Sequence, residues 1–116
     1  MLSKQLKWYP LFDHISELEQ LLELSDSKVY RNMFGEILFV KDQGNYYAFK
    51  NKCPHQNKSL ENCKVLEGQV ICPWHQYQYS CETGRGHGLY IDKYPLKFEN
   101  DAVFIGKEVW TLFAKK

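Results

Sequence analysis

The sequence predicts an all-β domain of short antiparallel strands with one short helix near the N-terminus. Three observations lead to this class. Short runs rich in β-branched and aromatic residues recur along the chain, turn residues separate them at close spacing, and only one early stretch has helical periodicity. Short strands with closely spaced turn signals are typical of an all-β sandwich or barrel.

The chain opens with a predicted edge or opening strand at residues 6–11, which is short, aromatic and closed by a proline. Residues 15–24 follow as an amphipathic helix, because their apolar side chains recur at three- and four-residue spacing with glutamates on the other face. Ser16 followed by Glu19 is a candidate capping box, and Asp13 is an alternative cap. This helix is expected to cover one end of a sheet.

The periodicity changes to that of strands after residue 28. Two β-rich segments are predicted at residues 29–34 and 36–40, with a bulge or bend at Gly35 between them. Residues 42–45 have the composition of a hairpin turn, so residues 46–49 are expected to form the return strand.

The second half of the chain continues the β pattern. Residues 65–71 are predicted to form a tight hairpin whose return strand runs directly into Cys72, and residues 76–81 to form another strand. The glycine-rich segment 82–88 lacks the ending and the following helix of a phosphate-binding loop, so it is interpreted as a turn. The remaining predicted strands are 89–91, 96–99 and 102–105.

Length and composition limit the class of protein. A chain of 116 residues with 44% hydrophobic residues is expected to be one domain, residues 1–116. No apolar window is long enough for a transmembrane helix, and the first residues lack the apolar region of a signal peptide. The formal net charge is +1 with charges interspersed. We therefore expect a cytoplasmic protein with no membrane partner and no nucleic acid partner.

Two short segments each combine one cysteine and one histidine. Cys53-Pro54-His55 and Cys72-Pro73-Trp74-His75 give the pattern C-x-H, sixteen residues, C-x-x-H. Each segment can bind a metal through a thiolate and an imidazole. A Cys₂His₂ set can hold zinc, but zinc sites usually pair cysteine with cysteine and histidine with histidine along the chain. A mixed pair in each segment favours a centre whose two metal ions require different ligands.

This pattern resembles that of the Rieske [2Fe–2S] domain, in which two histidines replace two cysteines on one iron. A proline follows each cysteine, Trp74 precedes the second histidine, and Tyr79 and Thr83-Gly84 follow it. The resemblance covers residues 29–105 and implies a Rieske-type β-sandwich with a cluster-binding subdomain, whose loops span about residues 51–81. It implies one [2Fe–2S] cluster bound by Cys53, His55, Cys72 and His75.

The same resemblance assigns roles around the cluster. In high-potential relatives, tyrosine at the position of Tyr79 donates a hydrogen bond to a ligand thiolate, and serine at the position of Tyr77 donates to a sulfide. Their loops are also braced by a disulfide, at positions occupied here by Lys58 and Trp74. One donor is kept and one is lost, so a potential in the lower or middle part of the family range is expected.

This sequence departs from the family pattern after both histidines. The position after His75 usually carries glycine and is Gln76 here, and the loop after His55 contains Gln56-Asn57 where relatives often carry glycine. These departures are expected to affect loop conformation and partner recognition.

The other cysteines and histidines are expected to have structural roles. Cys63 and Cys81 are interpreted as buried thiols, with a bridge between them as the alternative. His14 at the helix start and His87 in the glycine-rich turn are expected to be surface residues.

The resemblance implies a Rieske-type ferredoxin, which carries single electrons from a reductase to an oxygenase. An alternative is the redox small subunit of a larger enzyme, such as a nitrite reductase-like complex, and a zinc module is the third hypothesis. After the cluster is supplied, only His14 and His87 are left for a second iron site, so independent oxygenase activity is not expected.

Overall fold

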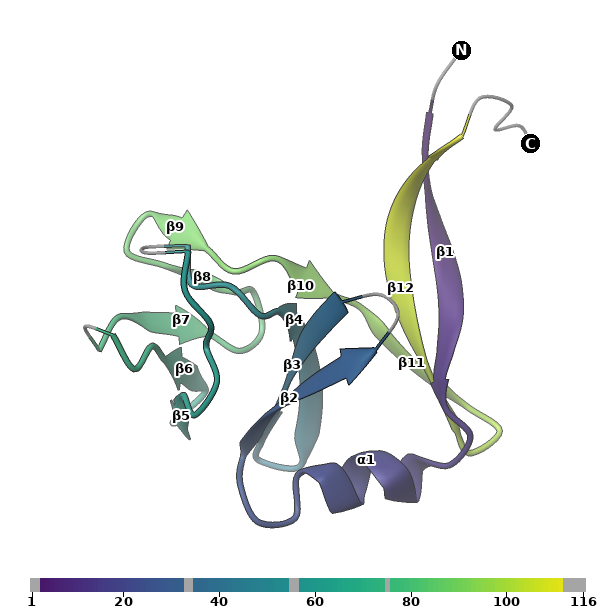
Figure 1. The fold of residues 1–116 in the computed structure, drawn as a ribbon, viewed down its shortest axis with the longest axis horizontal. Helices are drawn as coiled ribbons and strands as arrows, with labels where there is room; N and C mark the ends of the chain where they lie inside the picture. Colours follow the sequence, from purple (N-terminus) through teal and green to yellow (C-terminus); the bar gives the residue numbers. More distant parts are fainter. Residues whose placement is uncertain (1–2, 33–34, 55–56, 75, 112–116) are drawn as a thin grey trace.

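The computed structural model describes residues 3–32, 35–54, 57–74 and 76–111. It confirms the all-β class: strands dominate, and α1 (Ile15–Leu21) is the helix of the described residues (Figure 1). No helix in the described part of the chain is long and apolar enough to cross a membrane.

The central layer is an antiparallel sheet with the strand order β10-β4-β3-β2. Its strands are β2 (Ser27–Asn32), β3 (Gly35–Asp42), β4 (Asn45–Lys50) and β10 (Lys93–Tyr94). The turn predicted at residues 42–45 is confirmed, because Asp42 pairs with Asn45 across it.

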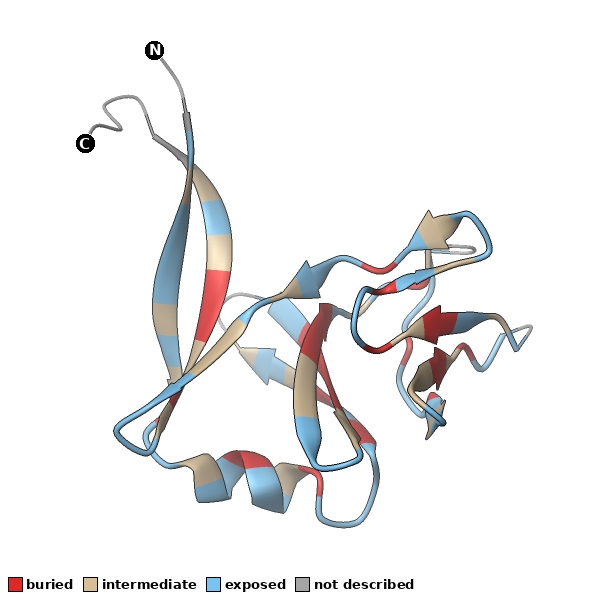
Figure 2. Ribbon diagram, turned by 180° about the vertical axis from the view of Figure 1, so that it is seen from behind, coloured by how far each residue is buried: buried red, intermediate tan, exposed pale blue. Residues whose placement is uncertain are grey.

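Strand β3 is buried on both faces, which explains its continuous apolar sequence. Alternate side chains of a strand point to opposite faces, so Leu38 and Val40 enter one hydrophobic core while Ile37 and Phe39 enter another. The first core contains the candidate metal ligands Cys53 and Cys72, and the second packs under α1. Figure 2 shows these buried positions on the central strands and in the small subdomain.

A three-stranded sheet with the order β1-β12-β11 packs beside the central layer. Strands β1 (Ser3–Phe12) and β12 (Ala102–Thr111) pair along almost their whole length and form a two-stranded ribbon that projects from the body, with the start of β1 and the end of β12 at its tip (Figure 1). Strand β11 (Leu96–Glu99) pairs only with the base of this β1/β12 ribbon. Both long strands exceed their predicted ranges of 6–11 and 102–105, because the backbone of each strand pairs with the other beyond those ranges.

The small subdomain, residues 51–90, carries the two cysteine loops on short strands. One sheet contains β5 (Lys64–Leu66), β6 (Gln69–Ile71) and β7 (Gln78–Ser80), and a two-stranded ladder joins β8 (Arg85–Gly86) to β9 (Leu89–Tyr90). The tight hairpin predicted at 65–71 is confirmed. The strand predicted at 76–81 is shorter than expected because residues 76–77 close the second cysteine loop instead.

Two predictions about the first half of the chain need correction. Of the bulge or bend predicted at Gly35, the bulge is wrong: β2 pairs antiparallel with β3, and Asn32 pairs with Gly35, so the chain reverses between the two strands; residues 33–34 lie outside the described ranges. The helix ends at Leu21 rather than at residue 24, and Leu24 is 97% exposed. Its last turn tightens, because the Glu23 N–H donates to the Gln20 carbonyl three residues back.

The helix start also differs from both predicted caps. His14 is the N-cap residue, and the Glu17 carboxylate accepts its backbone N–H at 3.1 Å. The turn between β11 and β12 completes this end: the Asp101 carbonyl accepts the Ile15 N–H at 2.7 Å, and its carboxylate lies 2.9 Å from His14 Nδ1. A tertiary contact therefore selects His14, where sequence spacing favoured Ser16 or Asp13.

Candidate metal centre

The first cysteine loop follows strand β4 and is closed by backbone hydrogen bonds. The Asn57 N–H donates to the Cys53 carbonyl at 2.6 Å, and the Cys53 N–H donates to the Lys58 carbonyl at 2.7 Å. These two bonds link Cys53 to Asn57 and Lys58, so Cys53 is held by both its backbone donor and its backbone acceptor.

The second cysteine loop, which follows strand β6, repeats this frame at equivalent positions. The Gln76 N–H donates to the Cys72 carbonyl at 3.1 Å, and the Cys72 N–H donates to the Tyr77 carbonyl at 2.7 Å. The fifth residue of both loops is left-handed, with φ of 57° at Asn57 and 61° at Gln76. Two copies of one loop geometry therefore present the two cysteines to a common point.

The two loops bring the sulfur atoms of Cys53 and Cys72 within 3.2 Å of each other in the core. Both residues are buried, and both thiols are free. Burial, together with the neighbouring Cys53 thiol, raises the pKa of the Cys72 thiol to about 11. A bare thiolate pair is therefore unfavourable here, and a bound metal centre would supply the compensating positive charge.

The hydroxyl of Tyr79 is the observation that best fits a metal centre with sulfur ligands. Tyr79 lies on β7, is fully buried, and its hydroxyl has no hydrogen-bond partner among the described residues. Burial raises the pKa of this phenol, and the adjacent Cys53 raises it further. A buried hydroxyl without a partner is unfavourable, so an anionic sulfur at this point would satisfy it.

His55 and His75, the histidine half of the predicted ligand set, lie outside the described residues, as does Gln56. The structure therefore places the cysteine half of the motif. Of the predicted neighbours, Tyr79 lies against the cysteines, and Trp74 and Tyr77 belong to the second loop or close it.

Trp74 connects the second loop to the first. Its indole Nε1–H donates to the Ser59 carbonyl at 3.0 Å, and the ammonium of Lys58 lies 4.4 Å from the centre of its ring. Lys58 and Trp74 occupy the two positions where the resemblance places a disulfide in high-potential relatives. A cation–π contact and a hydrogen bond thus join the loops at the place of that covalent link.

Asn51 fixes the segment that leaves the first loop. Its side-chain amide donates to Ser59 Oγ at 2.8 Å and its carbonyl oxygen accepts the Leu60 N–H at 2.7 Å. The same amide donates to Glu36, which also pairs with Arg31. Sequence reasoning missed Asn51, because its partners come from strand β3 and from beyond the loop.

His87 lies in an exposed turn, but its ring packs against strand β7 and against Tyr77 at the end of the second loop. Its ring lies 4.6 Å from that of Tyr77 and 6.2 Å from that of Tyr79, centre to centre. Its Nε2 accepts the Gln78 N–H at 3.2 Å, so the ring is held in a defined orientation although its residue is exposed.

The glycine-rich segment is a packing element as well as a turn. A side chain at Gly86 would bring its Cβ within 2.0 Å of the Gln78 carbonyl oxygen, and one at Gly84 within 2.5 Å of the Ile91 carbonyl oxygen. The chain needs glycine here so that β8 and its flanks can approach the strand behind the second loop.

The remaining cysteines are buried thiols, as predicted. Cys63 and Cys81 are both free in the structure. Burial raises the pKa of Cys63, and it raises that of Cys81 to about 12.

Comparisons with known proteins show the family of this chain. The sequence model of the Rieske [2Fe-2S] domain family matches residues 8–91, a range that starts earlier and ends earlier than the predicted 29–105. A curated relative, the ferredoxin component of an alkene monooxygenase system from Xanthobacter autotrophicus, is 39% identical over 77 residues. That match covers 63% of this chain and 63% of the relative, so less than two thirds of the relative's length is spanned.

Two solved structures share the fold. A putative NADH-dependent nitrite reductase small subunit from Mycobacterium tuberculosis has a TM-score of 0.69 at 12% identity, over 89% of this chain and 96% of that one. The ferredoxin of carbazole 1,9a-dioxygenase from Nocardioides aromaticivorans has a TM-score of 0.61 at 19% identity, over 73% and 89% of the two chains.

Proposed function

Because this chain belongs to the Rieske [2Fe-2S] domain family, whose domain binds a [2Fe–2S] cluster, we propose that it is a ferredoxin that passes single electrons from a reductase to an oxygenase. One observation carries the proposal: two buried cysteine sulfurs lie 3.2 Å apart beside a buried tyrosine hydroxyl with no partner in the described chain. The alkene monooxygenase ferredoxin component supports the choice of an oxygenase system.

We assign the ligands as Cys53, His55, Cys72 and His75. When bound, such a cluster accepts and releases one electron. The core around Cys53 and Cys72 excludes water. With the cluster bound, the Tyr79 hydroxyl would donate a hydrogen bond to the Cys53 sulfur, which would satisfy a group that has no partner in the described chain. That donor stabilises the more negative, reduced state and so raises the reduction potential.

Backbone hydrogen bonds hold both cysteines in place, which favours electron transfer. Each cysteine is fixed through its backbone N–H and carbonyl, and Trp74 ties one loop to the other. Small structural change between oxidation states lowers the reorganisation that accompanies each transfer. Redox encounters usually bury small interfaces, so we expect the partners to bind transiently at the loop end of the molecule. We also propose a cytoplasmic location, which the two cysteines outside the candidate site support, because Cys63 and Cys81 are free thiols rather than a disulfide.

The four buried cysteines provide a matched test. After anaerobic reconstitution with iron and sulfide, the protein should bind two irons and two sulfides per chain, and the reduced form should give an electron spin resonance spectrum with average g below 2. Cys53→Ala and Cys72→Ala should abolish the visible absorption, whereas Cys63→Ala and Cys81→Ala, equally buried, should retain it. A colourless protein that binds one zinc would refute the proposal and support the zinc module.

The second candidate is a redox subunit of a larger, permanent complex. The β1/β12 ribbon favours it, because the ribbon projects from the body and exposes Leu6 and Trp8, at 47% and 36%. A putative nitrite reductase small subunit, which is by its name part of a larger enzyme, shares the fold. Affinity purification of the tagged protein from its native host distinguishes the two: a partner retained in equal amount through gel filtration supports a subunit, and a monomer supports the ferredoxin.

A further inference from the structure

Charge is unevenly distributed along this nearly neutral chain. The segment from residue 8 to residue 27 contains five acidic residues and no lysine or arginine, whereas the segment from 50 to 64 contains four lysines and one glutamate. A formal net charge of +1 therefore conceals an acidic part and a basic part. The acidic residues are Asp13, Glu17, Glu19, Glu23 and Asp26, and the lysines are Lys50, Lys52, Lys58 and Lys64.

In the structure, the four lysines surround the two cysteine loops. Lys50 and Lys52 line a hollow of about 330 Å³ together with Pro54 of the first loop. Lys64 lines a second hollow, of about 210 Å³, together with Cys72 of the second loop. Lys58 lies over Trp74, where the loops meet. We call these four lysines the basic rim.

The charges of the basic rim are not neutralised within the described chain. None of the four lysines forms an ion pair with another described residue. The one glutamate of this segment, Glu61, pairs with Arg31 at 3.4 Å. Asp92 is the one acidic residue that lines the larger hollow.

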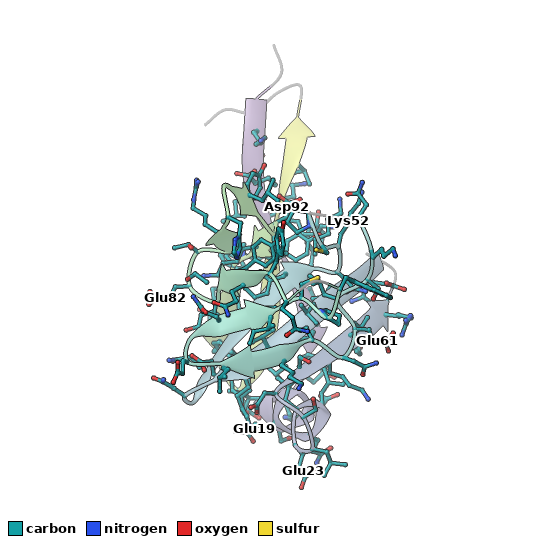
Figure 3. All side chains as sticks on the ribbon, turned by 90° about the vertical axis from the view of Figure 1, so that its left-hand side faces the viewer. Glu19, Glu23, Lys52, Glu61, Glu82 and Asp92 are labelled. Atoms are coloured by element: carbon teal, nitrogen blue, oxygen red, sulfur yellow. The ribbon has the colours of Figure 1, made fainter. Side chains whose placement is uncertain are left out.

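Four of the five acidic residues lie elsewhere, on α1 or within two residues of it, whereas Asp26 lines one hollow together with Lys64. Figure 3 shows Glu19 and Glu23 on the helix, well separated from Lys52 in the view that faces the small subdomain. The lysines of the basic rim therefore lie next to the candidate metal centre, away from the acidic side chains on α1. In a redox protein, such a local group of positive charges orients the approach of an acidic partner before contact.

We propose that the basic rim is the docking surface for an acidic patch on a redox protein partner. The inference rests on the proposed electron-transfer function and adds the charge of the partner surface to it. Two exposed aromatic side chains flank the rim and would supply apolar contact: Trp74 is 42% exposed, and Tyr90, which lines the larger hollow, is 59% exposed. The lysines would orient the partner and raise the rate of association, and the aromatic side chains would provide the buried contact area.

Small charged oxidants test the rim without a known partner. The reduced holoprotein is mixed in a stopped-flow instrument with ferricyanide, an anion, or with tris(phenanthroline)cobalt(III), a cation, at increasing ionic strength. We expect the rate with ferricyanide to fall about tenfold between 10 and 200 mM salt, and the rate with the cobalt complex to rise. A ferricyanide rate that stays constant or rises with salt overturns the proposal.

A pair of double variants separates local charge from net charge. Lys50→Gln/Lys52→Gln should remove most of the salt dependence with ferricyanide. Lys7→Gln/Lys107→Gln changes the net charge equally but acts on the β1/β12 ribbon, far from the loops, and should leave that dependence nearly unchanged. An equal effect of the two double variants refutes a docking role for the rim.

A binding measurement completes the test, because it does not depend on electron transfer. The holoprotein should be retained on immobilised poly-L-glutamate and elute at lower salt after the rim substitutions, but not after the ribbon substitutions. Equal retention of all three proteins contradicts the proposal. The two proposals fail in different ways. If the proposed function is wrong, the protein has no visible absorption after reconstitution. If only the docking proposal is wrong, the protein is coloured, but the rim substitutions change neither the salt dependence nor the retention more than the ribbon substitutions do.

Discussion

Replacement of Gln76 by glycine should stabilise the protein. Gln76 is the fifth residue of the second loop and has a φ of 61°, a left-handed conformation that costs a residue with a side chain about 1–2 kcal/mol. Glycine adopts it freely but loses about 0.4–1 kcal/mol through the greater freedom of the unfolded chain. The exposed Gln76 side chain forms no hydrogen bond or ion pair with another described residue that would offset the difference. The net gain is about 0.5–1 kcal/mol, which corresponds to an increase in Tm of about 2–5 °C.

Thermal unfolding of the reconstituted holoprotein, followed anaerobically by circular dichroism at one scan rate, measures this gain. The matched control is Gln78→Gly, two residues further on, because Gln78 is also exposed but lies in strand β7 with negative φ. That change should lower the free energy of unfolding by about 0.5–1 kcal/mol. If Gln76→Gly is as destabilising as the control, the left-handed strain assigned to the loop is absent.

Three further substitutions test other features of the structure. Gly86→Ala should cost at least about 3 kcal/mol of stability in urea unfolding, because its Cβ would meet backbone at 2.0 Å, while Gly88→Ala, with open space but a φ of 75°, should cost only about 1 kcal/mol; equal costs would contradict the packing role. Trp74→Phe keeps an aromatic ring but removes the indole hydrogen bond to the Ser59 carbonyl. The visible absorbance of the holoprotein should therefore bleach about fivefold faster, as expected for the loss of about 1 kcal/mol. An unchanged bleaching rate would show that this hydrogen bond does not hold the loops together. The Asp101 carboxylate raises the pKa of His14 above the unfolded value of about 6.5, so this pair stabilises the fold fully below about pH 6.5 and the contribution is lost as pH rises through the folded pKa. The stability difference between wild type and His14→Gln should therefore be larger near pH 5.5 than near pH 8.5, and a difference that grows with pH would reverse the assignment.

The sequence predicted much of the fold because its strands depend on local signals. Turn residues at 42–45 and 65–71 placed two hairpins correctly, since turn chemistry acts over a few residues. The ends of α1 were predicted less well. Its N-cap depends on Asp101, which is 87 residues away from His14 in sequence, and no local spacing contains that information.

The candidate site divides in the same way. The spacing of the cysteines and histidines, with the prolines that follow each cysteine, was sufficient to predict the family. The ligand set stays a prediction, of which the structure brings Cys53 and Cys72 together. The brace formed by Lys58, Trp74 and Ser59 was not predictable, because its hydrogen bond and cation–π contact depend on how the two loops pack together. The charges of the basic rim can be counted in the sequence, but only folding shows that they surround both loops.

What the sequence determined by itself is therefore the chemistry of the centre: which side chains are available to bind a metal, and that two loops present them. The tertiary structure decided how closely those loops approach, since the 3.2 Å separation of Cys53 and Cys72 results from two matching backbone frames. It also left the hydroxyl of Tyr79 buried beside them without a partner. The residue types alone indicate which side chains can bind a metal. The distance between the two sulfur atoms and the burial of Tyr79 arise only when segments remote in the chain pack around one core.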